Sequence, residues 1–349
     1  MKKLTFLLLT LLVSSFSSWA NTCKPVIAVY PVWLEDHPTA IKNLPWHQFS
    51  HIAIASIYPK EDGSLETTQA DTFIKQLVKA AKAHDTQVVI SVGGAHHASK
   101  GFLSIVKSED KLATFTQSLK RYVAKYNLDG VDIDWEYWTY QSELGKGGQD
   151  PIESKQLVKL AAMVNDTLPD DILLTADIAA GPWVGPQYLA ELQSHVDYLN
   201  LMAFDFTGAW SSSPIAHHSD FATFKLAINN VLNRGFTKDK LLISLPAYGI
   251  EFIDGENKQI NHVSYKSIAK TLGEDEKKIN QGQYGHIYFE TPSLIKQKVD
   301  YALKHDLAGF SFFEINSDSN NQAISLMNQL ALGVSTKSCA YSQLQPLAK

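Results

Sequence analysis

Cysteine is scarce in this 349-residue sequence: only Cys23 and Cys339 occur, one near each end. The first twenty residues of the chain predict export. An exported protein meets oxidising conditions, in which an exposed free thiol is disfavoured and two thiols that lie close together form a disulfide bond. We therefore expect a disulfide bond between Cys23 and Cys339. Two unrelated thiols are the alternative.

Basic residues do not outnumber acidic ones, since 31 Lys and Arg stand against 36 Asp and Glu, a formal net charge of −5. Binding to nucleic acid normally requires a basic patch or stripe. We therefore expect no nucleic acid among the partners of this protein.

Long apolar runs are absent after the first twenty residues. Residues 4–16 are almost wholly apolar, Lys2 and Lys3 precede them, and Ser18-Trp19-Ala20 follows as a small-x-small cleavage site. These features predict a signal peptide over residues 1–20 and a secreted or periplasmic mature chain. A membrane anchor is the alternative, but the run is well short of the ~20 residues that span a bilayer. No membrane association is expected after cleavage.

No stretch rich in proline, glycine and serine divides the rest of the chain, so residues 21–349 are expected to form a single domain. Short apolar and β-branched runs alternate with longer amphipathic stretches, which is typical of repeated βα units on a parallel sheet. Eight such units favour a closed (β/α)₈ TIM barrel, of the α/β class, over an open sheet. The predicted strands are residues 25–30, 49–57, 87–93, 128–136, 172–178, 196–204, 241–248 and 308–314.

Amphipathic periodicity predicts helices between these strands. They span residues 71–84, 111–126, 153–168, 221–233 and 293–305. Only residues 250–285, after the seventh strand, match no barrel element, and we expect them to form a short polar insertion on the loop side.

The fourth predicted strand carries three acidic residues, Asp132, Asp134 and Glu136. Strand side chains alternate between faces, so all three point the same way. Burial of unpaired charge is costly and like charges raise one another's pKa, so at least one carboxyl is expected to hold a proton near neutrality. Glu136 lies nearest the carboxyl end of the strand and is the natural proton donor for general acid catalysis.

A metal site and a purely structural cluster of carboxylates are the alternatives. One strand supplies only one side of a coordination shell, so no metal and no other cofactor is expected. The adjacent pairs His96-His97 and His217-His218 are expected to send their rings to different places and, as loop residues, to be solvated.

The run from Asp129 to Glu136, with Asp132 and Asp134 between them, resembles in full the D-x-x-D-x-D-x-E signature of family 18 glycoside hydrolases, the chitinase family. Ser91-Val92-Gly93-Gly94 is similar to the S-x-G-G element of that family, and Met202-Ala203-Phe204-Asp205 is similar to its M-x-Y-D element. The resemblance covers nearly all of the mature chain, and the three elements lie in the right order on the right predicted strands.

The resemblance implies a substrate-assisted retaining mechanism that cleaves β-1,4 linkages between N-acetylglucosamine units. The acetamido oxygen of the substrate would attack the anomeric carbon while Glu136 protonates the leaving oxygen, so no nucleophile from the enzyme is needed. Asp134 would hold the acetamido N–H and share a proton with Asp132. Asp205 would help to bind the acetamido group and tune Glu136.

Two positions depart from the family pattern. Phe204 stands where most members have a tyrosine whose hydroxyl donates to the acetamido carbonyl, and losing a hydrogen bond of ~1–3 kcal/mol would slow turnover ~10- to 100-fold. Phe313 stands where the family usually has a tryptophan beneath the sugar, and its smaller ring bears on affinity more than on chemistry. The resemblance also places Gly94, Trp135 and Met202 beside the substrate.

Aromatic residues follow several predicted strands at the end where barrels of this type carry their active sites. Packing beneath a loop is the alternative for each single tryptophan, but four at one rim favour a glycan-binding cleft. Tyr248, at the end of the seventh strand, is a further candidate for substrate contact, whereas Trp46, which precedes a strand, is expected in the core. The four rim tryptophans are Trp33, Trp138, Trp183 and Trp210.

The main interpretation is therefore an endo-acting chitinase with a shallow groove, because the insertion at 250–285 is short. Its partner is chitin or another oligosaccharide that contains N-acetylglucosamine, and a monomer is expected. An endo-N-acetylglucosaminidase that acts on N-glycan cores and a catalytically weak chitin-binding lectin are the alternatives. Because of the replacements Phe204 and Phe313, a lectin remains an alternative interpretation, whereas the presence of Glu136 and its neighbouring aspartates favours an enzyme.

Overall fold

The computed structural model describes residues 24–137, 151–180, 188–210, 212–253 and 259–334. The predicted signal peptide, Cys23, Cys339, Trp138 and Trp183 lie outside these ranges. The disulfide bond and the substrate contacts expected of the two tryptophans therefore stay predictions. No helix in the described part of the chain is long and apolar enough to cross a membrane.

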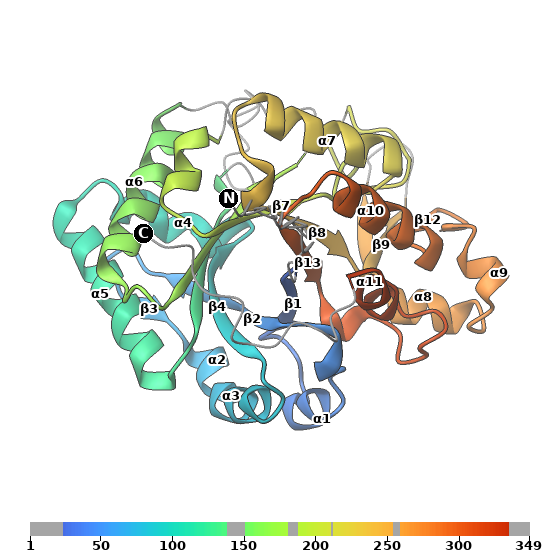
Figure 1. Ribbon diagram of the computed structural model, residues 1–349, viewed down its shortest axis with the longest axis horizontal. Helices are drawn as coiled ribbons and strands as arrows, with labels where there is room; N and C mark the ends of the chain where they lie inside the picture. The colour runs from blue at the N-terminus through green and yellow to red at the C-terminus, as the bar shows by residue number, and fades with distance from the viewer. Residues whose placement is uncertain (1–23, 138–150, 181–187, 211, 254–258, 335–349) are drawn as a thin grey trace, which may run out of the picture.

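Eight parallel strands form a closed barrel (Figure 1). Their order is β1-β13-β8-β7-β6-β5-β4-β2, and β1 pairs with β2 to close the ring. The predicted (β/α)₈ barrel is confirmed, and each predicted strand overlaps one barrel strand. The barrel strands are β1 (Val26–Pro31), β2 (His51–Pro59), β4 (Gln87–Gly94), β5 (Gly130–Trp135), β6 (Leu173–Ala179), β7 (Tyr198–Met202), β8 (Leu241–Pro246) and β13 (Gly309–Phe313).

Helices surround the barrel on its outer side (Figure 1). All five predicted helices are present, although the first is divided into two pieces, α2 and α3. The helices outside the insertion are α1 (His37–Lys42), α2 (Thr68–Asp71), α3 (Ile74–Ala83), α4 (Lys100–Ile105), α5 (Glu109–Tyr126), α6 (Pro151–Thr167), α7 (Phe221–Asn233), α10 (Pro292–Lys304) and α11 (Leu326–Val334). A short strand, β3 (Leu65–Glu66), pairs antiparallel with β2, and 3₁₀ turns cover residues 46–48, 96–99, 190–194, 238–240 and 315–317.

Side-chain caps set where several of these helices begin. The Asp220 carboxylate accepts from the backbone N–H groups of the first turn of α7. Thr291 caps α10, in which Pro292 occupies the first turn, a position where its missing N–H costs nothing. Helix α5 ends at Asn127, which adopts the left-handed conformation with φ of 51°. Local sequence therefore defines the helices before they pack on the barrel.

The inside of the barrel is layered. Towards one end, Ile27, Ala53, Val89, Leu173, Leu242 and Ala308 form a small apolar cluster. Next to it lies a layer of buried polar side chains from six strands, namely Ser91, Asp132, Thr175, Asn200, Ser244 and Ser311. Small and polar residues leave space inside the barrel at this level, and the functional site lies above it.

The segment after β8 folds into more than the polar loop that we expected from the sequence. It forms an antiparallel sheet in the order β10-β9-β12-β11, at one side of the barrel (Figure 1). Its first strand already starts at Tyr248, where Tyr248, Ile250 and Phe252 alternate as buried residues. The elements are β9 (Tyr248–Phe252), β10 (Ile260–Ser264), α8 (Tyr265–Thr271), α9 (Glu276–Ile279), β11 (Gln283–Tyr284) and β12 (Ile287–Phe289).

Candidate active site

Strand β5 directs its acidic residues into the barrel and its apolar residues outward. Val131, Ile133 and Trp135 are at most 1% exposed. The ring of Trp135 packs against Phe102 and Tyr137, with centroid distances of 5.3 and 5.6 Å. The substrate contact predicted for Trp135 is therefore wrong, because strand alternation places its side chain on the face opposite to the carboxylates.

Asp132 lies deepest in the row and is held by three donors. Its Oδ1 accepts from Thr175 Oγ1 at 2.5 Å and from Asn200 Nδ2 at 3.1 Å. Its Oδ2 accepts from Ser91 Oγ at 2.8 Å. Burial raises the pKa of Asp132, and these donors oppose that rise because they stabilise the carboxylate.

Asp134 and Glu136 lie above Asp132 and have strongly shifted acidities. Burial, followed by the negative charges of Glu136 and Asp132, raises the pKa of Asp134 well above its usual range. Burial, followed by the charges of Asp177 and Asp205, raises the pKa of Glu136 to about 8. The prediction that a carboxyl of this row holds a proton near neutrality agrees with these shifts, and Glu136 has the acidity that a general acid needs.

Glycine is required where β4 meets the acidic strand. A Cβ atom on Gly93, which has φ of 115°, would lie 2.1 Å from the Asp134 carbonyl oxygen. Gly94 has φ of 118°, a backbone conformation that residues with a side chain rarely adopt. Ser99 Oγ then donates to the Gly94 carbonyl at 2.6 Å and accepts from the Glu136 N–H at 3.2 Å. The strand end that carries Glu136 is thus anchored by its backbone.

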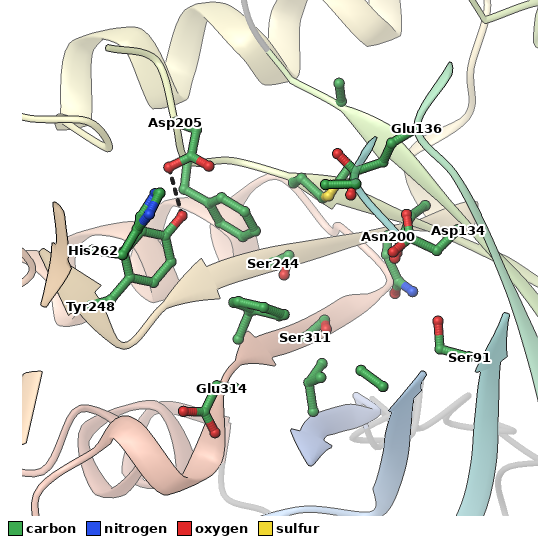
Figure 2. Close-up of a pocket in the computed structure, with 18 of the residues that line it drawn as sticks. Ser91, Asp134, Glu136, Asn200, Asp205, Ser244, Tyr248, His262, Ser311 and Glu314 are labelled. Carbon is green, nitrogen blue, oxygen red and sulfur yellow. Dashed lines mark hydrogen bonds between the residues drawn. The ribbon is translucent and has the colours of Figure 1, made fainter. Parts of the chain in front are cut away.

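Asp205 faces the row from the carboxyl end of β7. Figure 2 shows Asp205, Tyr248 and His262 together on one side of the pocket and Glu136, Asp134 and Asn200 on the other. The hydroxyl of Tyr248 donates to Asp205 Oδ1 at 2.6 Å, and His218 Nδ1 lies 3.4 Å from the same oxygen.

These neighbours keep Asp205 charged. Enclosure acts to raise the pKa of Asp205, but the hydrogen bond and charge of His218, with smaller contributions from Tyr248 and His262, outweigh it and hold the pKa below its ordinary value. Because Asp205 stays ionised, it adds negative charge that makes Glu136 harder to deprotonate.

A cavity of about 790 Å³ joins these groups at the mouth of the barrel. Trp33 and Trp210, 55% and 40% exposed, lie at its rim as the sequence predicted. Trp46, in contrast, is 7% exposed and belongs to the core, also as predicted. The other predicted site residues that line the cavity are Asp132, Asp134, Glu136, Met202, Phe204, Asp205, Tyr248 and Phe313.

Aromatic rings form one wall of the cavity. Phe204 lies 5.9 Å from Tyr248 and 6.0 Å from Phe313, centroid to centroid. The inserted sheet continues this wall with Ile250, Ile260, His262 and Ser264. The groove is therefore closed on this side by structure that we did not predict.

Sequence reasoning missed several residues of the site. Asp177 on β6 lines the cavity, and it stands out in its strand as an acid two positions after Thr175 on the same face. Ser91, which binds Asp132, was quoted within a family element but was given no role, and Asn200, which also binds Asp132, lies two residues before the next element and was not singled out. His218 and His262 reach Asp205 from a loop and from the insertion, and no local pattern announces either.

The expectation for the second histidine pair is also wrong. His218 is 0% exposed, and its ring lies nearly parallel to that of His217, with centroids 5.7 Å apart and an interplanar angle of 7°. His217 Nε2 hydrogen-bonds with the Phe289 carbonyl at 2.8 Å. Both rings are held because the loop folds under the inserted sheet. Among the described residues, no group of three His, Cys, Asp or Glu side chains is arranged to hold a metal ion.

Residues 26–318 match the family model described as "Glycosyl hydrolases family 18". The chain belongs to glycosyl hydrolase family 18. The resemblance inferred from the sequence is thereby confirmed, and so is the prediction of a glycosidase. The match includes every strand of the barrel and the inserted sheet.

Relatives of this family 18 glycosidase carry related names. It is 24% identical to "Probable chitinase 2" of Drosophila melanogaster over 89% of this chain and 77% of that protein. It is 25% identical to "Endochitinase 1" of Metarhizium anisopliae over 76% and 70% of the two chains. The crystal structure of a chitinase from Bacteroides thetaiotaomicron shares the fold, with a TM-score of 0.76, 21% identity, and coverage of 90% of this chain and 97% of that one.

Proposed function

We propose that this protein hydrolyses β-1,4 linkages between N-acetylglucosamine units of chitin or chito-oligosaccharides, with retention of configuration and with Glu136 as general acid and base. The observation that carries the proposal is the row of Asp132, Asp134 and Glu136 beneath the cavity, in which the pKa of Glu136 is raised to about 8. The chitinase names of relatives such as the Metarhizium protein support the same substrate class.

The geometry supports a defined sequence of steps. Glu136, protonated at neutral pH, gives its proton to the glycosidic oxygen, and the bond between this oxygen and the anomeric carbon breaks. The acetamido oxygen of the same sugar bonds to the anomeric carbon and forms an oxazolinium ion. Asp134 Oδ1, which is buried and accepts no hydrogen bond from the described residues, receives the acetamido N–H. Water then attacks the anomeric carbon, whose bond to the acetamido oxygen breaks so that the acetamido group is restored, while ionised Glu136 accepts a proton from the water.

We propose that the mature protein acts outside the cytoplasm, in keeping with the signal peptide expected at residues 1–20. Cleavage of an N-glycan core and binding without turnover are alternative outcomes rather than parallel proposals. One relative has a chitinase-like name rather than a chitinase name: human "Chitinase-3-like protein 2" is 24% identical over 65% of this chain and 63% of that protein.

The test compares the mature protein with Glu136→Gln on chitotetraose to chitohexaose. We expect wild type to release short oligomers that are initially β-anomeric, as followed by chromatography and NMR. Glu136→Gln should lose at least about 100-fold in kcat, because general acid catalysis contributes ~10²–10⁴-fold. Glu276→Gln, at an exposed position in α9, is the matched control and should behave as wild type.

Other results would each point elsewhere. Binding of chitohexaose by wild type without cleavage would show that the protein is a lectin and not an enzyme. Release of a high-mannose glycan from a glycopeptide, without cleavage of chitohexaose, would show that N-glycan cores are the substrate. Unchanged turnover in Glu136→Gln would remove Glu136 from the role of acid.

A further inference from the structure

A further carboxyl group, that of Asp177, enters the cavity beside the acidic row. Asp177 lies on β6 in register with Asn200 on β7, and one residue beyond the pairing of Ala176 with Ile133 on β5. Its side chain hydrogen-bonds with Asp132 and with Asn200. Asp177 thus stands between the two strands that carry Asp134 and Asn200.

Acidic side chains far outnumber basic ones around the described part of the cavity. Six carboxyl groups line it, and none of its described lining residues is Lys or Arg. Charges this close cannot all be ionised in an enclosed site, so the cluster must retain protons. The positions of these protons are set by the hydrogen bonds that each carboxyl makes.

The hydrogen bonds assign one of these protons. Two carboxyls bond to each other only when one of them is protonated. Asp132 accepts from Ser91, Thr175 and Asn200 and is therefore the carboxylate of its pair. The proton lies on Asp177, which donates to Asp132. Asp134 makes no comparable bond, and its Oδ1 is buried with no hydrogen-bond partner among the described residues.

We propose that Asp177 is a positioning residue of the acid-base machinery, which takes the place of Asp134 as the proton-sharing partner of Asp132 and so leaves Asp134 free for Glu136 and the substrate. The Asp177–Asp132 pair holds one proton and one negative charge throughout the reaction cycle. Asp134 need not turn away from Asp132 when the substrate binds, because Asp177 is already the hydrogen-bond partner of Asp132. This inference rests on the proposed hydrolysis of N-acetylglucosamine linkages.

The acidities agree with this arrangement. Burial, followed by the charges of Asp132 and Asp134, raises the pKa of Asp177 well above its usual range. The negative charge that Asp177 shares with Asp132 is in turn the first, after burial, that raises the pKa of Glu136. The other titratable groups that face this cluster from the surrounding elements are Tyr188, Asp205, Tyr248, His96, His262 and Glu314.

Asp177→Asn tests the proposal, because the amide still donates to Asp132 but carries no charge at any pH. Because protonated Asp177 is uncharged as well, the variant leaves the charge of the pair unchanged, and Glu136 should titrate at the same pH. We expect the alkaline limb of kcat/KM for chitohexaose to stay in place, whereas a downward move of about one pH unit would show that Asp177 is ionised in wild type and would overturn the assignment of the proton. Asp306→Asn, which removes an exposed carboxyl between α10 and β13, is the matched control and should leave the profile in place.

Asp177→Ala separates the positioning role from a general loss of charge. Without the donor at position 177, Asp132 takes Asp134 as its proton-sharing partner, and Asp134 is drawn away from the substrate. We expect kcat to fall about 10- to 100-fold with a smaller change in KM. Equal kcat values for Asp177→Ala and Asp177→Asn would overturn the positioning role.

A titration without substrate distinguishes this inference from the proposed function. The carboxyl ¹³C signal of Glu136, assigned with Glu136→Gln, is followed against pH by NMR in wild type and in Asp177→Asn. An unmoved titration in the variant supports the inference even if wild type cleaves no chito-oligosaccharide. A downward shift shows that Asp177 carries the charge in wild type, and overturns the inference even if wild type is an active chitinase. If Asp177→Asn does not fold, Asp177→Ser, which also keeps an uncharged donor, takes its place in the same titration.

Discussion

Glu136 depends on its surroundings for its proton. Burial, the negative charge that Asp177 shares with Asp132, and the charge of Asp205 raise the pKa of Glu136 from an ordinary 4.5 to about 8. We expect kcat/KM to stay level up to about pH 8 and to fall about tenfold per pH unit above it, because only the protonated form acts as the acid. The measurement is a pH–rate profile on chitohexaose. An alkaline limb near pH 5 would contradict the raised pKa of Glu136.

The same shift has a consequence for stability. Because the folded pKa of Glu136 exceeds the unfolded one, the folded protein binds more protons between about pH 4.5 and 8. The contribution of this group to stability is therefore fully present at low pH and is lost as pH rises through 8. Glu136→Gln should gain in melting temperature relative to wild type between pH 5 and pH 8, and a constant difference would count against the shift.

Phe204 lacks the hydroxyl that the family resemblance places against the acetamido carbonyl. Its ring lies among Tyr248 and Phe313, at the wall of the cavity. We expect Phe204→Tyr to raise kcat about 10-fold or more, since one transition-state hydrogen bond contributes ~1–3 kcal/mol. Phe204→Leu, which keeps an apolar side chain, should not gain. Steady-state kinetics of both variants decides, and a rate no higher than wild type for Phe204→Tyr would show that the hydroxyl has no partner there.

At the scale of elements, helix α10 is tied to the loop that carries His218. Lys298 is 0% exposed, pairs with the equally buried Glu290, and donates to Ser219 Oγ at 2.7 Å. Ser219 follows His218, which contacts Asp205. A charge buried inside the helix packing therefore holds the position of a residue in the active site.

Removal of this cation should be costly. We expect Lys298→Met to lower the free energy of unfolding by about 3–5 kcal/mol, because Glu290 is left as an uncompensated buried charge. Lys296→Met on the same helix breaks only an exposed pair with Asp300 and should cost at most about 1 kcal/mol. Urea denaturation measures both, and similar losses in the two variants would refute a special role for the buried pair.

At the scale of the whole molecule, the barrel brings Trp33 and Trp210 to one rim from loops after β1 and β7. Exposed tryptophan faces stack on sugar rings, so each Trp→Ala change should raise KM for chitohexaose about 3- to 10-fold and leave the melting temperature nearly unchanged. Trp46→Ala, in the core, should lower the melting temperature and leave KM for chitohexaose nearly unchanged. An unchanged KM in both rim variants would place the bound chain elsewhere.

Sequence reasoning reached the fold and the acidic row but not the walls of the site. Each barrel strand is a short apolar run, and Asp132, Asp134 and Glu136 share a face by strand alternation alone. The same alternation, applied fully, would have assigned Trp135 to the core. The inserted sheet was missed because its strands are short and partly polar, so they carry little periodicity of their own.

The sequence by itself determined the eight βα units, the family signature and the candidate for the acid, since these depend on residues that are near neighbours along the chain. Only the closed barrel decided that Asp177 reaches Asp132, that His218 and Tyr248 meet at Asp205, and that the insertion lines the cavity. These contacts join residues tens of positions apart, and no local pattern encodes them. The acidity of Glu136 therefore arises from tertiary packing, because burial and distant charges set it.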